Sequence, residues 1–220
     1  MMVRNLVVVG ASADGVEALR TMVHGFPPDL DAAVLIVLHI PPGAPSALPK
    51  ILARSGPLPA IAARDGQRIM TGHIYVAPAD RHLLIRDGQI ALSRGPLENG
   101  HRPAVDPLFR SAARHFGSRV IGVILSGSRD DGTAGLAAIV ERGGIPIVQE
   151  PDTALHRSMP CTALDHLEIE HVLHPGKIGE LVADLVAQET VTLLAQESAP
   201  SAFPQISYSW RRRLSPSSTP

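Results

Sequence analysis

Residues 6–15 read Leu-Val-Val-Val-Gly-Ala-Ser-Ala-Asp-Gly, and this stretch decides the fold class. A short β-branched run ends in a turn of small residues, and a helical pattern follows from Gly15 to His24. The run is far shorter than the ~20 apolar residues of a membrane span, and no signal-peptide cleavage site follows it. We therefore interpret Leu6–Gly10 as a buried strand and expect a cytoplasmic protein that is not inserted in a membrane.

The same alternation of apolar runs and helical patterns continues along the chain. Continuous apolar runs are typical of parallel strands that helices cover on both faces. The middle differs, because His82–Arg86 and Gln89–Ser93 flank the two-residue turn Asp87-Gly88, which indicates a hairpin. The sequence thus predicts a single α/β domain with a mostly parallel β-sheet, flanked by helices, and an antiparallel hairpin excursion. Further strands are expected at Val34–His39, His73–Ala77, Val120–Leu125 and Ile145–Gln149, and further helices at Pro49–Ala53, Asp106–Phe116 with Asp106 as N-cap, Gly132–Arg142 and Lys177–Ala187.

Composition and charge narrow the class of protein. The 220 residues suit one domain, and a net charge of -1 does not favour a nucleic acid as partner. Cys161 is the only cysteine, so no internal disulfide can form and a reducing compartment fits. We expect Cys161 to be a small core residue rather than a nucleophile. Residues 1–195 are expected to form the domain, and residues 196–220, rich in Ser and Pro and containing Arg211-Arg212-Arg213, a disordered tail.

Ser12 stands where the first predicted strand meets the first predicted helix. The carboxyl ends of parallel strands form the ligand crevice of such folds, and backbone N–H groups at a helix start can stabilise an oxyanion. A serine nucleophile needs both of these features. Two other interpretations stay open here. In the first, Ser12 caps the following helix. In the second, it belongs to a phosphate-binding turn, although the dinucleotide fingerprint has its second glycine where this chain has Ser12.

His39 and Asp131 follow two further predicted strands. A serine hydroxyl needs a neutral imidazole as its base, and the imidazole needs a carboxylate that orients it. The alternatives are a histidine satisfied at a strand end, and aspartates, Asp130 or Asp131, that cap the following helix. If the three strands are neighbours, a hydroxyl, an imidazole and a carboxylate converge in one crevice, which favours a catalytic triad. Its chain order, Ser–His–Asp, differs from that of the α/β-hydrolases.

Five segments resemble, in order and at natural spacing, the catalytic domain of the chemotaxis protein-glutamate methylesterase (CheB) family. Gly10-Ala11-Ser12 is similar to the family's G-A-S-T-G-G turn, and Leu38–Pro41 to its strand-end histidine. Leu125–Gly132 aligns with its L-T-G-M-G-x-D-G run, which assigns the catalytic aspartate to Asp131 rather than Asp130. Two longer stretches, residues 72–82 and 102–111, are similar to other signatures of the family. The likeness covers roughly residues 3 to 190.

The resemblance implies a serine hydrolase that removes methyl groups from glutamate γ-methyl esters on chemoreceptors and that can also deamidate receptor glutamines. It implies the catalytic residues Ser12, His39 and Asp131, with oxyanion donors near Ala13 and Ser128. The chain departs from the family at Ala13, where threonine is frequent, at Asp14, where glycine is, and at Ser128, where methionine is. A backbone N–H donor at Ser128 would be insensitive to the side-chain change.

Partners and alternatives follow from the same resemblance. The expected partners are the methylated cytoplasmic helices of chemoreceptors. Since the chain begins at the first strand of the resembled domain, any control is expected from a separate receiver or regulatory protein. Arg102 is a candidate for orienting the receptor helix, with an ordinary surface arginine as the alternative. Neither a metal nor another cofactor is expected. The alternative function is a catalytically idle adaptor domain in a chemosensory-like complex; a nucleotide-binding module is disfavoured, because a Walker motif is missing.

Overall fold

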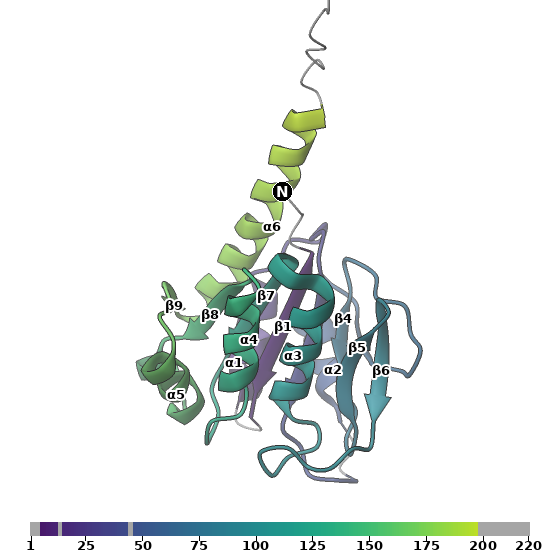
Figure 1. The fold of residues 1–220 in the computed structure, drawn as a ribbon, viewed down its shortest axis with the longest axis vertical. Helices are drawn as coiled ribbons and strands as arrows, with labels where there is room; N and C mark the ends of the chain where they lie inside the picture. Colours follow the sequence, from purple (N-terminus) through teal and green to yellow (C-terminus); the bar gives the residue numbers. More distant parts are fainter. Residues whose placement is uncertain (1–4, 13–14, 44–45, 198–220) are drawn as a thin grey trace, which may run out of the picture.

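The centre of the molecule is a seven-stranded parallel sheet (Figure 1). The computed structural model describes residues 5–12, 15–43 and 46–197, with side chains as far as residue 188. The strand order is β3-β4-β2-β1-β7-β8-β9, and neighbouring strands run parallel, which confirms the predicted sheet. The strands are β1 (Leu6–Ala11), β2 (Ala33–Leu38), β3 (Ala60–Ala62), β4 (Ile74–Val76), β7 (Val120–Ile124), β8 (Ile145–Gln149) and β9 (His171–Leu173).

Helices cover both faces of the sheet. One layer holds α1 (Val16–His24), α2 (Leu48–Ser55) and α6 (Pro175–Glu197), and the other holds α3 (Val105–Phe116), α4 (Thr133–Glu141) and α5 (Ser158–His166). The apolar residues of β1 alternate between these layers: Val7 and Val9 pack with the first, and Leu6 and Val8 with the second. This period of two is what a strand buried on both faces requires. The 3₁₀ turns Gly117–Arg119 and Pro151–Thr153 lie before β7 and after β8.

The predicted hairpin forms a separate two-stranded antiparallel sheet, β5 (His82–Arg86) and β6 (Gln89–Ser93). Its turn residues Asp87 and Gly88 both have positive φ, 51° and 74°, as the tight turn between antiparallel strands requires. The backbone N–H of Ile85 donates to Ser111 Oγ of α3 at 3.0 Å. The hairpin therefore packs beside α3 as an addition to the central sheet.

The structure corrects one local prediction. Asp106 is not the N-cap of α3, because the helix begins at Val105 and Ala104 occupies the cap position. Asp106 lies in the first turn, and its carboxylate bonds to the start of α4 instead. The late helix predicted at Lys177–Ala187 also extends further in both directions, as α6. The predicted tail, residues 196–220, lies outside the described residues from residue 198 onward.

The chain order creates a switch point at β1. After β1 the chain adds β2 on one side, and it later adds β7 on the other side. Ligand sites of open α/β sheets lie outside the carboxyl ends of the strands at such a point. In Figure 1 this carboxyl edge is at the end of the sheet away from the projecting part of α6.

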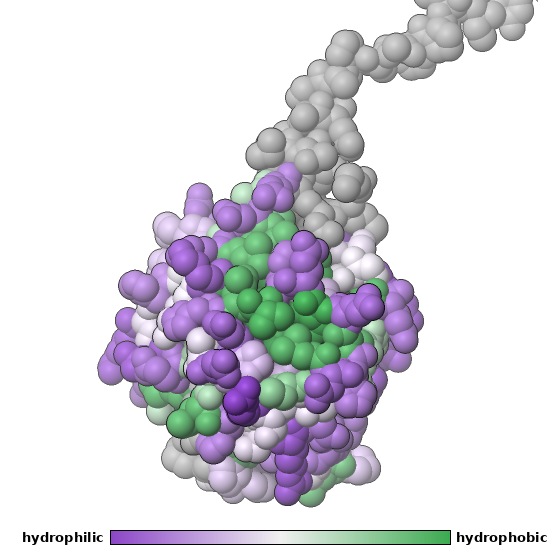
Figure 2. Space-filling model, turned by 90° about the vertical axis from the view of Figure 1, so that its left-hand side faces the viewer, coloured by the Kyte–Doolittle hydropathy of each residue, from purple (hydrophilic) through white to green (hydrophobic). Residues whose placement is uncertain are grey.

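The face bordered by α6 and β9 carries an apolar patch, which Figure 2 shows. Partly buried residues of β8, β9 and α6 pack against the core there, among them Ile145, Leu173, Leu181 and Leu185. Even so, within the described ranges no helix combines the length and the apolar composition that crossing a membrane requires.

Candidate active site

Ser12 is the first residue after β1, at the carboxyl edge of the sheet. Its backbone N–H donates to Ser126 O at 3.1 Å, and its carbonyl accepts from Gly15 N at 2.8 Å. Gly127, in the loop after β7, lies against it, since a methyl group added at Gly127 would be 3.0 Å from Ser12 Cβ. Ser12 is only partly buried, and α1 has Gly15 at its N-cap with no side-chain cap bond. The serine is thus held by its backbone and does not cap the helix.

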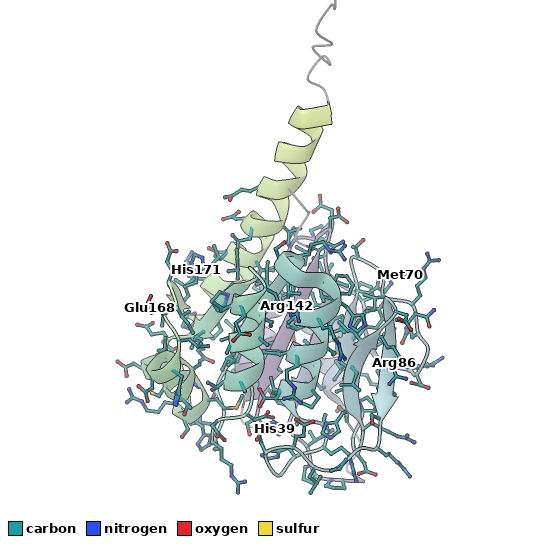
Figure 3. The ribbon with its side chains drawn as sticks, viewed as in Figure 1. His39, Met70, Arg86, Arg142, Glu168 and His171 are labelled. Atoms are coloured by element: carbon teal, nitrogen blue, oxygen red, sulfur yellow. The ribbon has the colours of Figure 1, made fainter. Side chains whose placement is uncertain are left out.

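His39 lies beside Ser12 on the neighbouring strand. Ala11 pairs with Leu38 in the parallel register, so Ser12 and His39 are the next residues on the two chains. The backbone N–H of His39 donates to Ala11 O at 3.0 Å. The His39 side chain is 4% exposed, and Figure 3 shows it at the carboxyl edge of the sheet. The register therefore places His39 and Ser12 side by side at the ends of β2 and β1.

Asp131 is fully buried and holds His39 through a 2.7 Å hydrogen bond between Asp131 Oδ2 and His39 Nε2. It also accepts from Val105 N at 2.7 Å, Asp106 N at 3.1 Å and Asn99 Nδ2 at 2.8 Å. Burial raises the pKa of Asp131, but the hydrogen bonds from His39, Val105 and Asn99 outweigh it, so the pKa lies below its usual value of 3.8. The carboxylate is therefore ionised at neutral pH, and Nε2 of His39 carries the proton that it accepts.

The other ring nitrogen of His39 is not used by Asp131. His39 Nδ1 is buried and has no hydrogen-bond partner among the described residues. Within the same residues no hydrogen bond joins it to Ser12 Oγ, and the contacts between catalytic groups are often looser in a ligand-free site. Asp130, in contrast, is exposed and is not bonded to His39. The structure thus separates the two aspartates that the sequence could not separate by residue type alone.

The carboxylate of Asp106 is linked to that of Asp131 through Asn99. Its Oδ1 accepts from Gly132 N at 3.1 Å and Gly135 N at 2.7 Å, and its Oδ2 from Asn99 Nδ2 at 2.8 Å. Burial raises the pKa of Asp106; the bond from Gly135 lowers it, the negative charge of Asp131 raises it further, and the net pKa is raised. Asn99 bridges the two carboxylates. Sequence reasoning missed both Asn99 and this role of Asp106.

His101 covers the face of His39. The two rings are stacked, with centroids 3.8 Å apart and planes 2° from parallel. His101 ends a tight turn in which Asn99 and Gly100 both have positive φ, and it exchanges two backbone hydrogen bonds with Glu98. Burial lowers the pKa of His101, and so does the neighbouring His39. His101 is therefore biased toward its neutral form. The segment 102–111 was singled out in the sequence, but the histidine just before it was not.

The remaining predicted site residues differ in how closely they approach the triad. Ser128 is exposed and follows Gly127, whose own N–H is occupied by His156 O at 2.8 Å. Arg102 is 22% exposed and is engaged within the protein, since it bonds to Asp80 and donates to Gly95 O at 2.7 Å. Ala13 lies outside the described residues.

Arg102 thus has a structural contact, while its contact with a receptor helix stays a prediction. Asp80 responds to this contact: the hydrogen bond from Arg102 lowers the pKa of the Asp80 carboxyl. The described residues contain no group of three or more His, Cys, Asp and Glu side chains arranged for a metal ion.

Comparisons with known proteins identify the family and the fold of the chain. Residues 7–182 match the sequence model of the CheB methylesterase family. The chain is 37% identical over 179 residues to the protein-glutamate methylesterase/protein-glutamine glutaminase of Yersinia pestis, an alignment that covers 80% of this chain and 51% of that protein. It is 34% identical over 193 residues to the protein of the same name from Salmonella typhimurium, covering 86% of this chain and 55% of that protein.

The solved structure of the Thermotoga maritima CheB methylesterase catalytic domain superposes with a TM-score of 0.80 at 31% identity. That match covers 84% of this chain and 100% of the other. The chain spans about half the length of the curated relatives that it matches. With a family match over most of its length and the same fold, the chain belongs to the CheB methylesterase family.

Proposed function

We propose that the chain is a serine esterase that hydrolyses glutamate γ-methyl esters on the cytoplasmic helices of chemoreceptors. Ser12 is the nucleophile, His39 the general base and Asp131 the carboxylate that orients the base. One observation carries the proposal: a buried imidazole is hydrogen-bonded to an ionised buried carboxylate at 2.7 Å and lies next to a partly exposed serine in the strand register. The names of the relatives supply the substrate class.

The tautomer of His39 fixes the direction of proton transfer. Asp131 accepts the Nε2 proton, so Nδ1 carries the free electron pair. As Ser12 Oγ attacks the ester carbonyl carbon, its proton passes to Nδ1, and Asp131 stabilises the imidazolium that forms. The tetrahedral intermediate collapses, the bond to methoxide breaks, and Nδ1 returns the proton to release methanol. Water then repeats the sequence on the acyl-enzyme and leaves a free glutamate carboxylate.

The oxyanion of the tetrahedral intermediate needs donors on the opposite side of the carbonyl from His39. We assign this role to the backbone N–H groups of Ser128 and Ala13. Gly127 N is excluded, because it already donates to His156 O. A preorganised pair of such donors stabilises the developing charge without reorganising during the reaction. A glutamine side chain would react through the same acyl-enzyme and release ammonia instead of methanol.

The alternative is a catalytically idle adaptor domain. Such a domain would have no need for the four hydrogen bonds that hold Asp131 against His39. We favour the enzyme for this reason, and propose that it works in the cytoplasm.

Methanol release from a methylated receptor fragment tests the proposal. Ser12→Ala should lower the rate by on the order of 10³–10⁶-fold. Ser118→Ala is the control, because Ser118 lies in the 3₁₀ turn before β7 rather than at the carboxyl edge. Unchanged turnover in Ser12→Ala would eliminate the serine mechanism, and absence of methanol release by the wild-type chain would favour the adaptor.

A further inference from the structure

Arg129 adopts a backbone conformation that few arginines adopt. It lies in the loop that carries Asp131, and its φ is +69°, in the left-handed region that favours glycine. Residues held in such regions cluster at sites of function. The strained backbone of Arg129 is therefore a reason to expect a function for its side chain.

The Arg129 side chain lies over the turn that covers the catalytic histidine. A methyl group added at Gly100 would be 3.1 Å from Arg129 Nη1. Gly100 directly precedes His101, whose ring stacks on His39. At the other end, Arg129 is two residues beyond Gly127, which lies against Ser12. The exposed guanidinium therefore sits on the rim of the catalytic site.

Three acidic groups of the described residues near Arg129 are already occupied or face elsewhere. Glu98 pairs with Arg110, and Asp131 is fully buried in its own set of hydrogen bonds. Asp130 lines a hollow between α4 and α5. In the part of the chain that the structure describes, Arg129 takes part in no ion pair or hydrogen bond, whereas Arg102 pairs with Asp80. Among the described residues, Arg129 is thus a cation at the mouth of the site without a counter-ion.

We propose that Arg129 forms a carboxylate-binding subsite for an acidic side chain close to the scissile ester on the substrate polypeptide. This inference rests on the proposed esterase function and adds a substrate preference to it. A guanidinium binds a carboxylate through two parallel hydrogen bonds, which gives both charge and orientation. Because each hydrolysis creates a new glutamate carboxylate, a segment with several esters becomes a better ligand for Arg129 as it is hydrolysed.

Two helical peptides test the subsite. Each carries one glutamate γ-methyl ester; one has a glutamate a single helical turn before and after the ester, and the other has glutamine at both places. Methanol release gives kcat and KM for the wild-type chain, Arg129→Gly, Arg129→Lys and Arg86→Ala. Glycine suits the left-handed backbone, so the first variant keeps its fold, which its thermal unfolding midpoint verifies. Arg86 is an exposed arginine of β5 and serves as the charge control.

The expected result is a selective loss. The wild-type chain should prefer the glutamate peptide by about 10-fold in kcat/KM, mostly through KM, which is the effect of one charge-assisted hydrogen-bonded pair. Arg129→Gly should abolish this preference by making the KM values for the two peptides equal, Arg129→Lys should keep part of it, and Arg86→Ala should keep all of it. Equal turnover of both peptides by the wild-type chain, or an unchanged preference in Arg129→Gly, would overturn the subsite while leaving the esterase intact. No methanol from either peptide would overturn both.

Discussion

Asp131 and Asp106 are linked reciprocally through two helix starts. Asp131, which precedes α4, accepts backbone hydrogen bonds at the start of α3, and Asp106, which belongs to α3, accepts them at the start of α4. Asp131 accepts from Val105 N and Asp106 N in the first turn of α3, and Asp106 accepts from Gly132 N and Gly135 N at the start of α4. The free N–H groups and the positive end of each helix dipole favour an anion there. The position of the Asp131 carboxylate therefore depends on how α3 packs against α4.

Asp131→Asn should abolish most of the activity. The substitution preserves size but removes the charge that fixes the His39 tautomer, and in serine hydrolases this costs on the order of 10⁴-fold in kcat. Asp130→Asn, one residue away and exposed, is the matched control and should change kcat by less than about threefold. Methanol release by the two variants decides the assignment. Larger damage from the Asp130 variant would mean that the other carboxylate serves His39.

Asp106→Ala should destabilise the fold and weaken catalysis together. Two buried N–H groups, those of Gly132 and Gly135, would lose their acceptor, at a cost of about 2–4 kcal/mol in the free energy of unfolding. Asp165→Ala, on the exposed surface of α5, should stay within about 0.5 kcal/mol of the wild-type value. Urea denaturation measures both. Equal stability of the two variants would show that Asp106 does not hold the start of α4.

Much of the fold was predictable because the apolar strands and the glycine-rich turns are local signals. The five predicted strands of the central sheet are confirmed, and so is the hairpin around Asp87-Gly88. The strands β3 and β9 were missed, and so was α5. Both strands are short and not fully buried, whereas the equally short β4 is buried throughout and has a clear apolar pattern. The Asp106 error has a physical cause: an aspartate before a proline resembles a cap, and only the packing of α3 on α4 offers it better donors.

The site was predictable to the extent that it follows from strand ends. Ser12 and His39 come directly after β1 and β2, and Asp131 lies in the loop after β7. A parallel sheet therefore gathers the three residues at one edge. Asn99 and His101 reach this edge from a turn after the hairpin, whose direction in space no local pattern encodes. The φ of Arg129 is likewise a property of the folded loop.

The stability of the fold should depend on pH through His101. Its pKa is lowered below 6.5 in the folded chain, first by burial and then by the neighbouring His39. A histidine of this kind contributes stability that is present above pH 6.5 and is lost as the pH falls through the folded value. Relative to His101→Phe, the wild-type chain should therefore lose stability between pH 7.5 and pH 5, which urea denaturation at both pH values measures. Parallel losses in the two proteins would contradict the lowered pKa.

The same position should affect catalysis through ring stacking. His101→Ala uncovers His39 and should lower kcat by about 10-fold, whereas His101→Phe keeps a flat ring on His39 and should restore most of it at pH 7.5. Rescue by phenylalanine distinguishes a positioning role from proton transfer by His101. Equal losses in both variants would indicate that the imidazole itself takes part in the chemistry.

The most direct test of the account compares methanol release by Ser12→Ala, His39→Ala and the variant that carries both substitutions. Groups that act as one unit give strongly non-additive losses, because removing the first already disables the second. We predict that the double variant is no slower than the slower single variant. A double variant whose loss equals the product of the two single losses would show that Ser12 and His39 act independently, and this result would contradict the triad.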